Sequence, residues 1–88
     1  MADIDRVLAL LNRMERLTKE SAGRLATVVM DIGDVQAMNE QALDSGSGYG
    51  RRISGLLLIT CNYLEQAASS LKLAEEQASK AADQLMGL

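Results

Sequence analysis

The chain has 88 residues, 48% of them hydrophobic and 2% aromatic, and a formal net charge of −3 at pH 7. This length corresponds to one small domain, residues 1–88, which buries little apolar surface by itself, so we expect a protein partner. The negative charge argues against nucleic acid as that partner, because binding to phosphates depends on an excess of Lys and Arg.

The first residues are unlike a secretory signal, since Asp3 and Asp5 stand where such a signal carries positive charge. The longest apolar run, 53–59, is far shorter than the roughly 20 residues that cross a bilayer as a helix. We therefore expect a chain that is cytoplasmic as made, with no membrane insertion. Any export would proceed without a cleaved signal peptide.

The first predicted element is a helix over about residues 3–43, because apolar residues recur there at alternating intervals of three and four. This seam consists of Ile4, Val7, Leu11, Met14, Leu25, Val28, Ile32 and Val35, with Thr18 and Ser21 in the interval. Gly23 and Gly33 interrupt the helix, and Gly55 interrupts the second one. We expect close packing or local bending at these glycines, and a hinge is the alternative.

A glycine-rich stretch follows at about residues 44–50 and predicts a tight turn, with glycines supplying positive φ angles. A flexible linker would instead require two domains of about 40 residues, which are rarely stable alone. Tyr49, between Gly48 and Gly50, is predicted to be exposed at the tip and to recognise a partner. The alternative is a structural tyrosine folded onto Leu43 or Ile53.

The second predicted helix covers about residues 51–86, and its seam keeps the same alternation. The seam residues are Ile53, Leu57, Thr60, Leu64, Ala67, Leu71, Ala74, Ala78, Ala81, Leu85 and Leu88. The predicted fold is all-α, an antiparallel two-helix hairpin. Apolar residues displaced from the seams, which one hairpin cannot cover, predict dimerisation into a four-helix bundle. These partner-interface residues are Leu10, Leu17, Leu56, Ile59 and Tyr63.

Charge is distributed unevenly along the first helix. Between Arg6 and Arg24 it holds five basic residues against Glu15 and Glu20, whereas the half near the turn holds only acidic charges. Two copies lying head to tail would place opposite charges together, so we expect antiparallel pairing, and a heterodimer with a similarly polarised partner is equally compatible.

The residues that catalysis requires are scarce. Histidine is absent, and no base accompanies the serines. The close carboxylates, Asp31 with Asp34 and Glu75 with Glu76, fit solvated helix surface better than acid–base chemistry. Cys61 is the only cysteine and sits among apolar residues, where a thiol is inert. We expect no enzyme, no cofactor, no metal site and no catalytic residue.

The chain resembles the Trp-x-Gly helical-hairpin proteins of bacterial type VII secretion in its length, two equal helices and glycine-containing central turn. Where that family has Trp-x-Gly, this chain has Gly48, Tyr49 and Gly50. The family's export signal, Tyr-x-x-x-Asp/Glu, has no counterpart, because Ala67 stands four residues after Tyr63. The resemblance implies an exported substrate, the tail-less member of a heterodimer, or a targeting partner of a larger exported protein.

Two other classes fit the same pattern. Small helical hairpins also build the needles and rods of type III secretion systems, where termini and turn mediate polymer contacts. A homodimeric four-helix bundle could alternatively serve as an adaptor or scaffold. Size in solution separates filament, heterodimer and homodimer.

Overall fold

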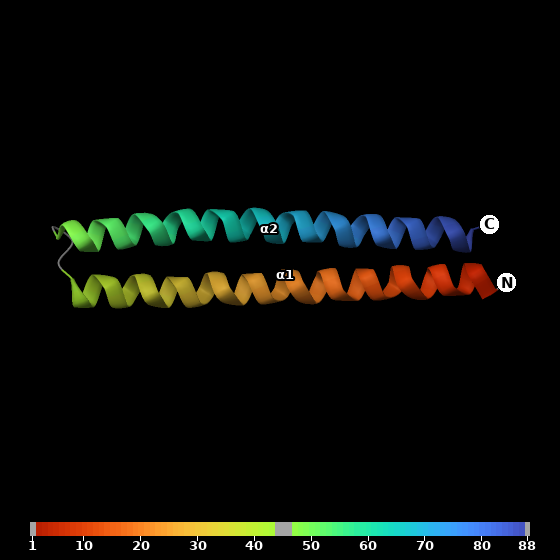
Figure 1. Ribbon diagram of the computed structural model, residues 1–88, viewed down its shortest axis with the longest axis horizontal. Coiled ribbons are helices and arrows are strands. Elements are labelled where there is room, and N and C mark those ends of the chain that lie inside the picture. The colour runs from red at the N-terminus through yellow and green to blue at the C-terminus, as the bar shows by residue number, and fades with distance from the viewer. Residues whose placement is uncertain (1, 44–46, 88) are drawn as a thin grey trace.

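The computed structural model describes residues 2–43 and 47–87 and contains two antiparallel α-helices. Helix α1 spans Ala2–Ala42 and helix α2 spans Gly48–Met86, so both chain ends lie at one end of the hairpin and the turn lies at the other (Figure 1). The molecule is a rod of 65 × 14 × 14 Å. The predicted all-α antiparallel hairpin is confirmed.

Helix α2 begins three residues earlier than the sequence pattern predicts. Ser47 is extended and caps the helix, since its hydroxyl accepts a hydrogen bond from the Gly50 N–H at 3.3 Å. Gly48, Tyr49 and Gly50 therefore belong to the first helical turn. Within the described residues no glycine has a positive φ, so the expected left-handed glycines are not found there. Residues 44–46 of the predicted turn, and Leu88, lie outside the described part.

The two helices meet along a seam whose residues are buried or half-buried at regular intervals of three and four. On α1 these are Leu8, Leu11, Glu15, Thr18, Ala22, Leu25, Val29, Ile32, Gln36, Asn39 and Leu43. On α2 they are Ser47, Gly50, Ser54, Leu57, Cys61, Leu64, Ala68, Leu71, Glu75, Ala78, Ala82 and Leu85. This continuous alternation matches the heptad pattern of two helices packed along their length.

The predicted seam is wrong at every second position, by one residue. Val7, Met14, Val28 and Val35 are exposed, and the residues that follow them face α2 instead. The same shift occurs on α2, where Ser54 rather than Ile53 faces α1. The reason is that the apolar stripe of each helix is wider than the surface that one neighbouring helix covers. The two helices therefore meet at the margin of the stripe, where polar residues begin.

Polar layers set the register near the turn. Gln36 Nε2 donates to the Ser54 carbonyl and hydroxyl oxygens, both at 3.2 Å, and Asn39 Nδ2 donates to the Gly50 carbonyl at 3.0 Å. Glu15 lies 21 residues before Gln36, and Glu75 lies 21 residues after Ser54, so the two glutamates occupy one layer. Polar side chains thus interrupt the seam at both ends.

The hairpin has almost no core of its own. Among the described residues only Ala22, Ala78, Ala82 and Gly50 are buried, and no large side chain is fully enclosed. The accessible surface is 6750 Å², against about 5,000 Å² for a compact monomer of this mass. The hairpin alone therefore has few buried apolar contacts to stabilise it.

Gly23, Gly33 and Gly55 are not sites of close packing. A Cβ added at Gly23, Gly33 or Gly55 would meet no neighbouring atom within 4 Å. The expectation of tight helix contact at these positions is therefore wrong.

Candidate protein-interaction face

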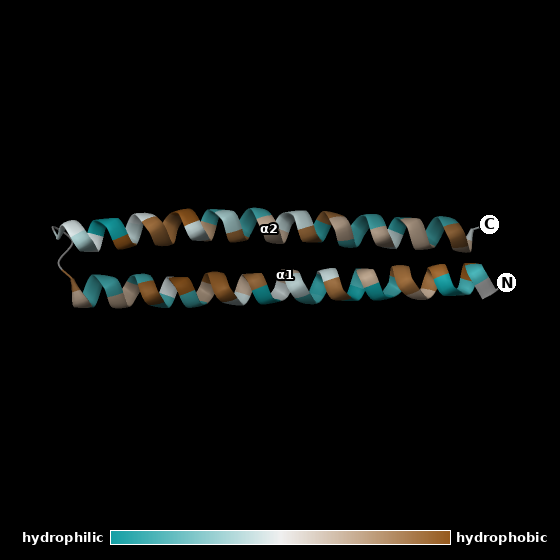
Figure 2. Cartoon of the chain, in the orientation of Figure 1, coloured by the Kyte–Doolittle hydropathy of each residue, from teal (hydrophilic) through white to brown (hydrophobic). Residues whose placement is uncertain are grey.

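A broad apolar surface runs along one side of the rod, here called the apolar face. It consists of the two lines of exposed positions next to the seam, spaced by three and four residues. On α1 its large members are Val7, Leu10, Met14, Leu17, Val28, Val35 and Met38, and on α2 they are Tyr49, Ile53, Leu56 and Tyr63. Smaller residues continue it along α2, namely Thr60, Ala67 and Ala74. Hydrophobic residues recur along the whole length of both helices (Figure 2).

The apolar positions of both helices lie on the same side of the rod. This follows because the other flank of each helix lines a single hollow on the opposite side. A hollow of about 470 Å³ crosses the seam on the other side and is lined by Lys19 and Ala26 from α1 and by Ser69 and Lys72 from α2. These residues occupy the flank of each helix that lies away from the apolar positions. The remaining flanks therefore share one side.

The structure brings most of the predicted interface residues together. Leu10 and Leu17 lie on the apolar face of α1, and Leu56 and Tyr63 lie on that of α2. Ile59 is the exception, since its position points to the outer edge of α2, about 50° from the line of Leu56 and Tyr63. Four of the five predicted interface residues thus share the apolar face, and Ile59 lies beside it.

The turn residues extend this face to the end of the rod. Tyr49 precedes Leu56 by seven residues, hence two helical turns, so it lies on the same line. Its side chain is 71% exposed, and the Arg52 guanidinium carbon lies 5.3 Å from its ring centroid. Gly48 is exposed and Gly50 is buried against α1. The alternative of a tyrosine packed down onto the helices does not hold.

Sequence reasoning missed the largest part of the face, because it assigned Val7, Met14, Val28, Val35 and Ile53 to the hairpin seam. A signal was available in the sequence. The residues that directly follow these five in the chain recur at the same spacing, so they too could form a seam, and several of them are polar. A seam that accepts polar residues while a neighbouring line stays apolar indicates that the apolar line faces something else.

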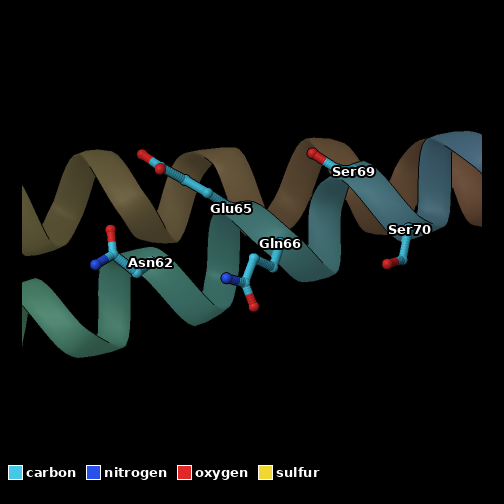
Figure 3. Close-up of a pocket in the computed structure, with 5 residues that line it drawn as sticks. All are labelled: Asn62, Glu65, Gln66, Ser69 and Ser70. Carbon is cyan, nitrogen blue, oxygen red and sulfur yellow. The ribbon is translucent and has the colours of Figure 1, made fainter.

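Other surface features offer little chemistry. The five polar side chains around the depression in Figure 3, Asn62, Glu65, Gln66, Ser69 and Ser70, rise from α2 alone and spread apart. Within residues 2–43 and 47–87, no three His, Cys, Asp or Glu side chains gather as metal ligands would. Cys61 is half-buried in the seam. In this described part, neither helix is long and apolar enough to span a membrane.

Comparison with known proteins finds no matching family, curated protein or solved structure. The apolar face is therefore the feature from which a function is inferred.

Proposed function

We propose that the protein is a non-enzymatic helical interaction module that binds another helical hairpin through its apolar face and so completes a four-helix bundle. The observation that carries this proposal is the direction of the apolar stripe. On each helix the apolar stripe comprises the two seam lines and the two lines of the apolar face, and its middle is rotated about 50° from the line toward the other helix of the hairpin, at 100° per residue. In a square bundle each helix points its apolar side about 45° from either neighbour, toward the common axis.

The size of the face supports a stable complex. Along the 65 Å rod, two adjacent helices of about 10 Å width present about 1,300 Å². A typical specific interface buries about 800 Å² on each partner. Large exposed residues on this face include Leu10 at 50%, Leu56 at 65% and Tyr63 at 68%. Covering them removes apolar surface that the hairpin alone leaves in water.

Within this class, we propose a substrate of a type VII-like secretion system, or a targeting partner of a larger exported protein, acting without a cofactor. The hairpin architecture, the single apolar face and the exposed Tyr49 at the turn support this assignment. Tyr49 then takes the place of the family's tryptophan, as an aromatic anchor for a partner pocket.

A homodimeric adaptor or scaffold is the second candidate, and the same apolar face supports it. A needle-like polymer subunit is supported less well. An open filament requires two different complementary surfaces on each subunit, whereas the large apolar residues here gather mainly on one side.

The test compares matched double variants. Leu56→Glu with Tyr63→Glu places two charges on the apolar face, whereas Leu58→Glu with Leu73→Glu places them elsewhere on α2, where both leucines are 60% exposed. The first pair should abolish self-association and co-purification with helical products of neighbouring genes. The second pair should preserve whichever association occurs. Equal behaviour of both variants, or a fully folded chain that associates with nothing, would contradict the proposal.

A further inference from the structure

Two charges interrupt the apolar face. On α1, the two lines of the apolar face between Val7 and Ala42 contain two charged residues, Arg24 and Asp31. On α2, the two lines between Ile53 and Ala81 contain no charged residue. Both charged residues are exposed and lie on the line that carries Leu10, Leu17 and Met38. They are seven residues apart, hence about 10.5 Å along the helix, which is too far for an ion pair with each other. A partner that covers this line must accommodate one positive and one negative charge.

We propose that the occupant of the apolar face is a second copy of this chain, lying head to tail, with Arg24 of each copy paired with Asp31 of the other. This inference rests on the proposed function and adds the partner's identity and its register. A two-fold axis across the rods places α1 antiparallel to α1 of the second copy. Two residues of opposite charge on one line then form two ion pairs by a single symmetric contact.

The same register matches the other residues on the α1 line. Residue numbers of paired positions add up to 55, so Leu17 of one copy lies against Met38 of the other. On the neighbouring line Val28 lies next to the two-fold axis and meets Val28 of the second copy. Large apolar side chains therefore fill the positions on both sides of the charge pairs.

The contacts of α2 with the second copy follow from the register of the two helices within one hairpin. In that register Gln36 lies level with Ser54, and Asn39 lies level with Gly50. The level of residues 27–28 on α1 is that of residues 62–63 on α2, so Tyr63 meets Tyr63 of the second copy. One heptad away, Leu56 meets Ser70, a large residue against a small one. Residues 13–42 of α1 overlap, which corresponds to about 45 Å.

The other symmetric arrangement leaves both charges unmatched. With the two turns at the same end, α1 of one copy lies over α2 of the other. Arg24 and Asp31 then face the α2 lines on which no residue between Ile53 and Ala81 is charged. Desolvating a charge without a partner costs free energy, so the head-to-tail arrangement is favoured.

The first test reverses the charges in the full-length chain and measures the dimer dissociation constant by sedimentation. Arg24→Asp or Asp31→Arg alone turns two attractive pairs into two repulsive ones and should weaken the dimer about tenfold or more at low salt. The double variant Arg24→Asp with Asp31→Arg should restore it. The matched control reverses Arg13 and Glu20, also seven residues apart but on the outer edge of α1. Those variants should leave the dimer unchanged.

The second test locates the two-fold axis by disulfide formation in the Cys61→Ser background. Val28→Cys should crosslink to its copy, because a disulfide requires Cβ atoms about 3.5–4.5 Å apart. Val35→Cys lies on the same line of α1. Its copies in the two chains should be separated by about 20 Å along the length of the helices, so this variant should not crosslink.

The outcomes separate this inference from the proposed function. Rescue by the double charge reversal together with selective Val28→Cys crosslinking supports the inference. A dimer that is insensitive to Arg24 and Asp31, or equal crosslinking at both cysteine positions, overturns it while the interaction module stands. A complex formed only with a different hairpin protein also overturns it. A folded monomer that binds neither itself nor another hairpin overturns the proposed function as well.

Discussion

The seam of this hairpin mixes apolar and polar side chains, whereas the neighbouring apolar face carries large hydrophobic side chains that the hairpin leaves exposed. The seam contains Glu15, Gln36, Asn39 and Glu75, and two amide oxygens there, Gln36 Oε1 and Asn39 Oδ1, are buried without a hydrogen-bond partner. The apolar face, by contrast, carries large hydrophobic side chains in water. We infer that the intramolecular contact sets the register, and we propose that most of the apolar burial forms between molecules.

The largest effect is expected from a charge at the centre of the apolar face. Val28→Asp should weaken assembly about a hundredfold or more, because an unpaired buried carboxylate costs several kcal/mol. Met30→Asp is the control, since Met30 is 73% exposed outside the apolar face. Isothermal titration by dilution measures both dissociation constants. Similar constants for the two variants would remove the distinction between the faces.

The second-largest effect, on the stability of the hairpin itself, is expected when polar residues of the seam are replaced by large apolar ones. Glu15→Leu with Glu75→Leu places two leucines in one layer and should raise the free energy of unfolding by about 2 kcal/mol, because half-buried carboxylates are replaced by apolar contact. Chemical denaturation measures the change. The substitution should also make the hairpin less dependent on assembly, which would appear as a weaker concentration dependence of the melting temperature. An unchanged or lower stability would show that the two glutamates do not share a layer.

A smaller gain is expected from the open glycines. Gly33→Ala and Gly55→Ala should each raise stability by about 1 kcal/mol, since alanine has the higher helix propensity and an added Cβ meets nothing within 4 Å. Both positions lie outside the apolar face, so the dissociation constant should stay the same. A loss of stability on thermal melting would indicate contacts that the free hairpin lacks.

The smallest effect on stability is expected at the turn. Tyr49→Ala removes an exposed ring and its contact with Arg52, which is worth about 0.5–1 kcal/mol at an exposed site. Helicity and melting should change little, whereas capture of the partner should weaken. Tyr49→Phe is the control, because it keeps the ring. A drop in stability comparable to that of a core truncation would instead assign Tyr49 a structural role.

The sequence predicted the helices well, because a long, proline-free heptad pattern leaves few alternatives to a hairpin. It predicted the seam only at alternate positions, since hydrophobicity alone cannot show which edge of a wide stripe meets the neighbouring helix. The start of α2 was missed because Gly48 and Gly50 are typical turn residues, whereas Ser47 caps a helix that includes them. Of the predicted interface residues, Leu10, Leu17, Leu56 and Tyr63 lie on the apolar face and Ile59 lies beside it, and their role in binding stays a prediction.

We propose that a second copy of the hairpin covers the apolar face, and sedimentation equilibrium combined with circular dichroism on the purified chain is the sharpest test of this pairing. At micromolar concentration the purified chain should have twice its mass of 9.5 kDa, and its melting temperature should rise with concentration. A fully helical monomer of 9.5 kDa, melting at the same temperature at every concentration, would contradict the account.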